Sequence, residues 1–210
     1  MAEITVVHLL RHGEVHNPNH VLYGRLPDYH LSANGRMMAA AAADFFDGRP
    51  VTAVFASPLE RAQETAQPVA DRLGLQITTD ERLIESGNVL EGTSVTLASL
   101  AVNPLKWKYL WNPFTPSWGE PYKQVAARVL LVVGRARETV RGQEAVCVSH
   151  QLPIWVTRLA AEQKRLWHNP STRQCELGSV TSFTFDGDDL TGVSYAVPPR
   201  QPVVDPDRAQ

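Results

Sequence analysis

The sequence has few cysteines and no long hydrophobic run. Cys147 and Cys175 are too few for a disulfide framework, and Cys147 lies in an apolar stretch that is typical of a buried thiol. No apolar run reaches the length that spans a membrane, and the amino terminus lacks the basic and hydrophobic regions of a signal peptide. These absences favour a cytoplasmic protein that does not associate with membranes.

An excess of one charge is also lacking. The chain has 20 Lys and Arg against 22 Asp and Glu, so its formal net charge is −2. This balance argues against a broad surface for nucleic acid, while a local basic pocket is still compatible with it. With 210 residues, 43% of them hydrophobic, and no internal repeat or linker, we expect one domain over residues 1–210.

The chain opens on a β-branched apolar run that ends abruptly in Arg11-His12-Gly13. This run predicts a buried strand, and Gly13 allows a sharp turn at its end. Ligands of open α/β sheets bind at the carboxyl ends of strands. A cation and an imidazole at that place indicate a site for an anion such as phosphate or carboxylate. For this tripeptide alone, a surface loop with two polar residues is the alternative.

Four histidines recur at every fourth residue, which on a helix would form a metal-binding face. The residues before His12 have strand composition, however, and Gly13 and Pro18 would interrupt a helix. We therefore predict no metal site here, and no cofactor is indicated. The four are His8, His12, His16 and His20.

Strands and helices alternate along the rest of the chain, which predicts an α/β fold with a mostly parallel sheet. Strands are expected over 51–56, 75–79 and 145–149, with a closing hairpin of 182–186 and 191–197. Helices are expected over 32–46 and 57–73, from 121 and from 151.

The helix expected over 57–73 has the clearest start signal. Ser57-Pro58-Leu59-Glu60 is typical of a capping box, with Ser57 as N-cap and Glu60 at the third helical position. Arg61 follows in the first turn, where a cation is unfavourable toward the helix dipole unless an anion lies nearby. Arg61 is therefore either part of a phosphate site or a solvated surface residue.

Three predicted strands thus end in polar side chains, at Arg11-His12, at Ser57 before Arg61, and at Ser149-His150. Parallel strands bring their carboxyl ends to one edge of the sheet. Two histidines and two arginines are therefore expected to converge there.

The composition changes over residues 93–118, where five aromatic residues lie among prolines. This stretch is interpreted as part of a lid-like insertion around 93–122 that covers a pocket mouth. The alternative is that its aromatic side chains belong to the core. Beyond about residue 198, the proline-rich and charged tail is expected to be loose.

Four blocks, in order, resemble the histidine phosphatase superfamily with its phosphoglycerate mutase-like fold, over nearly the whole chain. The resemblance implies a three-layer α/β/α sandwich with a mostly parallel central sheet. The blocks are Leu10-Arg11-His12-Gly13-Glu14, Leu31-Ser32 with Gly35, Ser57-Pro58-Leu59-Glu60-Arg61-Ala62, and Val148-Ser149-His150.

The resemblance also implies the roles of individual residues. His12 would be the nucleophile that forms a phosphohistidine, and Arg11, Arg61 and His150 would bind the phosphoryl oxygens. Glu85 matches the position of the acidic proton donor.

Two positions depart from the family pattern. The family usually has a phosphate-binding asparagine six residues after the nucleophile, whereas Asn17 lies five after His12 and Pro18 is the sixth. Asn17 is kept as a phosphate ligand through a shifted loop. The glycine spacing after the acid is also shortened, so that Glu91 stays an alternative to Glu85 as proton donor.

Physical chemistry agrees with this set of residues. Cations stabilise the negative charge that spreads over the oxygens of a transferring phosphoryl group, and an imidazole splits the displacement into two steps. A carboxylic acid can protonate the leaving alkoxide and then, as carboxylate, deprotonate water. We therefore expect a phosphomonoester hydrolase that acts on a small phosphorylated metabolite.

Two other functions are weighed against this one. A phosphoglycerate mutase would share the first step, but glycolytic mutases of the superfamily carry extra arginines near the acid, and residues 93–118 contain none. A catalytically inactive phospho-ligand binding module would not need the acid. The substrate and the oligomeric state are left open by the sequence, which is compatible with a homodimer.

Overall fold

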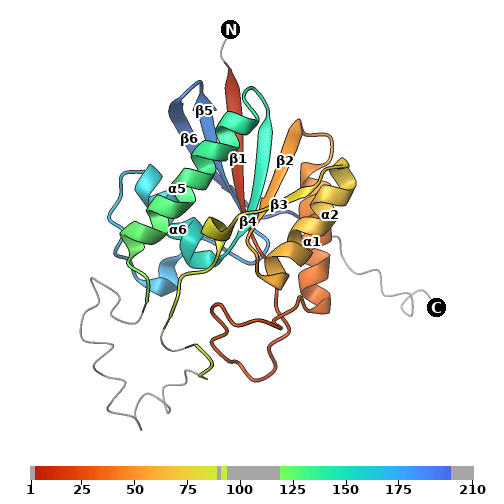
Figure 1. Ribbon diagram of the computed structural model, residues 1–210, viewed down its shortest axis with the longest axis vertical. Coiled ribbons are helices and arrows are strands. Elements are labelled where there is room, and N and C mark those ends of the chain that lie inside the picture. Colours follow the sequence, from red (N-terminus) through yellow and green to blue (C-terminus); the bar gives the residue numbers. More distant parts are fainter. Residues whose placement is uncertain (1–2, 89–90, 94–118, 200–210) are drawn as a thin grey trace, which may run out of the picture.

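A six-stranded sheet forms the centre of the molecule in the computed structural model, which describes residues 3–88, 91–93 and 119–199. Helices cover both faces of the sheet (Figure 1). The strands are β1 (Ile4–Arg11), β2 (Val51–Ala56), β3 (Ile77–Thr79), β4 (Glu144–Ser149), β5 (Val180–Asp186) and β6 (Asp189–Ala196). The helices are α1 (Ala33–Phe46), α2 (Glu60–Leu73), α5 (Tyr122–Thr139) and α6 (Gln151–Ala161), with the short 3₁₀ helices η1 (Glu81–Leu83) and η3 (Pro170–Thr172).

The strand order is β3-β2-β4-β1-β5-β6. The first four strands in this order are parallel, whereas β5 runs antiparallel to β1 and pairs with β6 as a hairpin. The predicted α/β sandwich with a mostly parallel sheet is thereby confirmed. Because β2, β4 and β1 are neighbours, the three polar strand ends lie side by side at one edge of the sheet.

Side chains alternate between the two faces of β1, which places the core on both sides of the sheet. Val7 and Leu9 pack into the cluster that contains the valines of α5, whereas Leu10 packs with residues of α1 and α2. Cys147 of β4 is fully buried in the α5 cluster, as its apolar surroundings predict.

The two predicted N-caps have different outcomes. Ser32 caps α1, because its hydroxyl accepts a hydrogen bond from the backbone N–H of Gly35 at 3.0 Å. The capping box at Ser57 is wrong: α2 begins only at Glu60, and the residue that precedes it, Leu59, makes no side-chain cap bond. The Ser57 hydroxyl accepts from the backbone N–H of Leu59 at 3.4 Å, just before the helix, and also lies 2.8 Å from Nε2 of His150.

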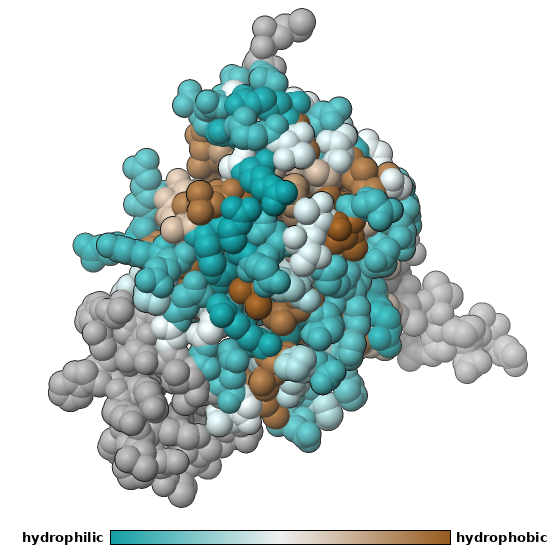
Figure 2. Space-filling view, viewed as in Figure 1, coloured by the Kyte–Doolittle hydropathy of each residue, from teal (hydrophilic) through white to brown (hydrophobic). Residues whose placement is uncertain are grey.

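The face shown in Figure 2 is mostly hydrophilic outside the grey residues, with hydrophobic residues scattered in small groups. Within the three described ranges, no helix is long and apolar enough to cross a membrane. Most of the predicted insertion, at residues 94–118, and the tail from 200 lie outside the described residues.

Candidate active site

The register of the parallel strands brings the site residues together. The backbone N–H of His12 donates to the carbonyl of Ser149 at 3.0 Å, and that of Ser57 donates to the carbonyl of Val148 at 3.0 Å. These bonds extend the pairing of β1 and β2 with β4 by one residue. His12, Ser57 and His150 therefore follow three adjacent strands, as the sequence predicts.

His12 is held in one orientation and one tautomer. It is only 2% exposed, and Nδ1 lies 2.8 Å from the carbonyl oxygen of Gly13. Because a carbonyl oxygen only accepts, Nδ1 must carry the hydrogen, which leaves the lone pair of the neutral ring on Nε2. Burial, followed by the charges of Arg61 and Arg11, lowers the pKa of His12 well below its usual value. The ring is therefore neutral at neutral pH.

His150 lies against His12 and is fully buried. The centroids of the two rings are 5.1 Å apart, and Nε2 of His150 contacts the Ser57 hydroxyl. Burial, followed by the charges of His12 and Arg61, lowers the pKa of His150 well below the ordinary range. A second neutral imidazole thus stands beside the first.

Two arginines supply the positive charge around the histidines. Nη1 of Arg11 donates to the carbonyl of Cys175 at 2.6 Å, and Nη2 of Arg61 donates to the carbonyl of Gly24. The guanidinium of Arg61 also lies over the ring of Tyr23, 4.8 Å from its centroid. These contacts fix both side chains but use only part of their hydrogen-bonding capacity.

Several buried nitrogen atoms of this cluster have no partner within the described ranges. They are Nε of Arg11, Nε and Nη1 of Arg61, and Nδ1 of His150, which is a donor in the tautomer whose Nε2 accepts from the Ser57 hydroxyl. Buried polar groups are nearly always hydrogen-bonded, so unpartnered donors of three neighbouring residues are unusual. A tetrahedral oxyanion can accept from all of them, and guanidinium groups bind such anions well.

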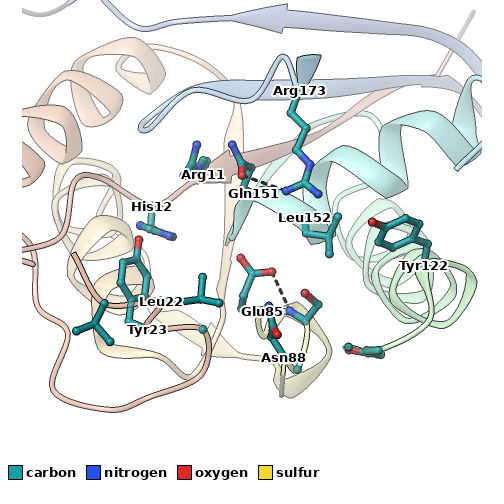
Figure 3. Close-up of a pocket in the computed structure, with 16 residues that line it drawn as sticks. Arg11, His12, Leu22, Tyr23, Glu85, Asn88, Tyr122, Gln151, Leu152 and Arg173 are labelled. Atoms are coloured by element: carbon teal, nitrogen blue, oxygen red, sulfur yellow. Dashed lines mark hydrogen bonds between the residues drawn. The ribbon is translucent and has the colours of Figure 1, made fainter. Parts of the chain in front are cut away.

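A cavity of about 270 Å³ adjoins His12 (Figure 3). Arg11, His12 and Glu85 line it, so the structure brings these three predicted residues to one space. Arg61 and His150 are completely buried and are not among its lining residues. The ring of His150 contacts that of His12, and the charge of Arg61 acts on His12.

Glu85 projects into the cavity from the segment after η1 (Figure 3). Burial raises its pKa, against the opposing effects of the Ser86 N–H, which donates to Oε1 at 2.8 Å, and of Arg61. Nε of Arg25 donates to the Glu85 carbonyl at 2.7 Å, and Nη2 of Arg128 donates to it at 3.3 Å. These bonds hold the backbone of Glu85, whose carboxyl group faces the cavity.

Glu91 has a different environment. Its Oε1 accepts from the backbone N–H of Asn88 at 3.1 Å, and its side chain lies against Gly24. It does not line the cavity. Of the two carboxyl groups, Glu85 is therefore the one placed to exchange a proton with a molecule bound beside His12.

Asn17 is not brought to this cavity. Its amide nitrogen donates to the carbonyl of Val21 at 2.9 Å, and its amide oxygen accepts from the N–H of Val21 at 3.0 Å. Asn17 lines a neighbouring hollow, together with Pro18. Both polar atoms of its amide thus hold the backbone loop in this structure, and the phosphate contact of Asn17 stays a prediction.

Other residues of the site were not found from the sequence. Tyr23, Gln151 and Arg173 line the cavity, and Glu120 links Arg25 with Arg128 beside it. Gln151 directly follows His150, so its place after a strand end was a usable signal. Arg173 comes from a loop without a recognisable pattern, and only the tertiary structure brings it to the site.

Comparisons with known proteins agree with this geometry. A sequence model of the histidine phosphatase superfamily (branch 1) matches residues 7–197. The chain is 55% identical over 199 residues to an uncharacterized protein of Mycobacterium tuberculosis, covering 94% of this chain and 98% of the relative. A probable phosphoglycerate mutase of Yersinia enterocolitica is 30% identical over 154 residues, which is 70% of each chain. The chain belongs to the histidine phosphatase superfamily.

Solved structures show the same fold. YhfR of Bacillus stearothermophilus has a TM-score of 0.73 at 26% identity, covering 92% of this chain and 95% of its own. A mycobacterial glucosyl-3-phosphoglycerate phosphatase in complex with inorganic phosphate has a TM-score of 0.68 at 26% identity, covering 87% and 89%. The three-layer sandwich is thus that of known members of the superfamily.

Proposed function

We propose that this chain is a phosphomonoester hydrolase that acts on a small phosphorylated metabolite through a phosphohistidine at His12. The observation that carries the proposal is the set of unpartnered buried donors beside a neutral imidazole whose lone pair is on Nε2. Two cations and an imidazole N–H match the oxygens of a phosphoryl group. A phosphomonoester would reach these donors through the cavity that Glu85 also lines.

In the first step, Nε2 of His12 attacks phosphorus in line with the ester oxygen. The N–P bond forms as the P–O bond to the alcohol breaks, and protonated Glu85 gives its proton to the departing alkoxide. Arg11, Arg61 and Nδ1 of His150 donate to the three equatorial oxygens, where the charge is spread. Burial favours the protonated form of Glu85 that this step requires.

In the second step, water attacks the phosphohistidine from the side that the alcohol has left. Glu85, now a carboxylate, takes a proton from this water as the new P–O bond forms. The N–P bond breaks, inorganic phosphate leaves, and both Glu85 and neutral His12 are restored. The positive charge needed in both steps comes from arginines, so the chemistry requires no metal ion.

A phosphoglycerate mutase is the second candidate, favoured by the 30% identity to a probable enzyme of that kind. The two activities differ in the fate of the phosphohistidine, which passes its phosphoryl group to water or to a second hydroxyl of the substrate. The test is to incubate the purified protein with phosphorylated metabolites and to measure both inorganic phosphate and positional isomers. We expect stoichiometric phosphate release, and isomerisation without release would assign the mutase instead.

A further inference from the structure

A third arginine lines the cavity away from the histidines. Arg173 follows η3, and its guanidinium points toward the space above Glu85 and Leu152 (Figure 3). Arg61 and Arg11 affect the pKa of both His12 and Glu85, and Arg173 affects that of Glu85 as well. Gln151 lies between Arg11 and Arg173 in Figure 3, so Arg173 belongs to the part of the cavity that lies beyond the phosphoryl-transfer centre.

The guanidinium of Arg173 is oriented by neutral partners. Its Nε donates to Nε2 of His168 at 2.8 Å, and Nδ1 of that ring lies 2.7 Å from the carbonyl of Leu166. Nδ1–H must donate to this carbonyl, which makes Nε2 the acceptor and keeps His168 neutral. The ring also stacks on Tyr122 with centroids 5.4 Å apart. Nη1 of Arg173 contacts Oε1 of Gln151 at 3.3 Å.

No carboxylate within 4 Å compensates this charge in the described ranges. Arg25 and Arg128, which donate to the Glu85 carbonyl, both pair with Glu120, whereas Arg173 forms no ion pair with a described residue. Residues 94–118, the long stretch outside those ranges, contain no aspartate or glutamate in their sequence. A half-buried guanidinium that is oriented but unpaired is costly, unless it meets an anion from outside.

Charge matching with the ligand leads to the same conclusion. In the proposed reaction Arg11 and Arg61 balance the two negative charges of a phosphomonoester, and Glu85 enters as a neutral acid. Arg173 is then a surplus positive charge on the cavity wall. The contact of Gln151 Oε1 with Arg173 leaves the Gln151 amide N–H₂ to donate to the same ligand.

We infer that Arg173 and Gln151 form a second anion subsite, so that the substrate is a phosphomonoester carrying a further carboxylate or phosphate group. This inference rests on the proposed hydrolase function of the site. A planar carboxylate can accept two parallel hydrogen bonds from a guanidinium, and a second phosphate offers the same oxygen chemistry.

The test compares 3-phosphoglycerate with glycerol 3-phosphate, which carries a CH₂OH group where the former has its carboxylate, and with propane-1,3-diol bisphosphate. We expect kcat/KM of the wild type to favour at least one of the two substrates with a second anionic group over glycerol 3-phosphate by about 10- to 100-fold, the effect of a charged hydrogen bond. Arg173→Gln should abolish that preference, mainly through KM, and Arg173→Lys should restore part of it. Whichever arm shows the preference identifies the second anion.

The matched control is Arg165→Gln, which removes the same charge from an exposed position without an ion pair to any described residue; the preference should be retained. Equal kcat/KM of the wild type for all three substrates would overturn the inference. An equal loss on all substrates in Arg173→Gln would also overturn it, since Arg173 would then act through Glu85. If no substrate is hydrolysed, the proposed function fails, and calorimetric binding of the same compounds to His12→Ala still tests the subsite by its preference.

Discussion

Replacing Gly13 by alanine should displace the nucleophile without touching any reacting group. A Cβ on Gly13 would lie 2.5 Å from the carbonyl oxygen of Gly35, whereas ordinary contacts begin at 3.4 Å. The two backbone segments must therefore separate by roughly 0.9 Å, the difference between these distances. Because the Gly13 carbonyl fixes Nδ1 of His12, this shift is passed on to Nε2. A misplacement of about 1 Å costs on the order of 10²-fold in rate.

The assay is kcat/KM for p-nitrophenyl phosphate, with urea denaturation to confirm that the variant is folded. Gly35→Ala closes the same contact from the other side, since its Cβ would lie 2.0 Å from the carbonyl oxygen of Glu14, and should also lose activity. Gly134→Ala is the control, because nothing lies within 4 Å of its added Cβ in α5. That variant should keep full activity and gain about 0.5–1 kcal/mol of unfolding free energy. A folded Gly13→Ala protein with wild-type kcat/KM would refute the positioning of His12 by this close approach.

Three further predictions concern the acid, the pH profile and a buried ion pair. Glu85→Gln should slow hydrolysis of an alkyl phosphate by about 10²–10⁴-fold but that of p-nitrophenyl phosphate far less, since nitrophenolate leaves without a proton. Glu91→Gln serves as the matched control, and the selective loss appearing there would move the acid to Glu91. The pH dependence of kcat/KM for an alkyl phosphate should fall at low pH as His12 is protonated, below its usual pKa of 6.5, and at high pH as Glu85 ionises, above 4.5. Glu85→Gln should remove only the alkaline limb, and a retained limb would assign it to another group. Burial raises the pKa of Glu144, but hydrogen bonds from His8 and Arg49 outweigh it and lower that pKa to about 2. The stabilisation by ionised Glu144 is therefore present above pH 4.5 and lost toward pH 2. Glu144→Gln should lower the unfolding free energy, measured by urea denaturation, by about 1–2 kcal/mol at pH 7 and progressively less in acid. A difference between wild type and variant that stays constant with pH would contradict this linkage.

The parts of the fold that could be predicted were those that local patterns determine. Residues close together in the sequence determine the β-branched run of β1, the Ser32 cap and the polar ends of three strands. The parallel topology then brings His12 and His150 together. The capping box was wrong because its Ser57 hydroxyl has a competing partner, His150, far away in the sequence. A local motif holds no information about such a competitor.

The rest of the site depends on packing that no spacing rule encodes. Arg173 reaches the cavity only because His168 and Gln151 orient its guanidinium across loops. The shortened loop after Glu85 left two candidate acids, and only the contacts of Glu91 with Asn88 and Gly24 separate them. Similarly, the sequence position of Asn17 did not indicate that its amide would bond to the backbone of Val21.

The most direct test of the account is to look for the phosphoryl group on His12. The wild-type protein is mixed with a ³²P-labelled phosphomonoester, quenched in alkali within milliseconds and digested for mass spectrometry. We predict an acid-labile, alkali-stable label on the peptide that contains His12, and neither label nor turnover in a folded His12→Ala variant. Rapid turnover with no label on His12, or wild-type activity in His12→Ala, would contradict the mechanism.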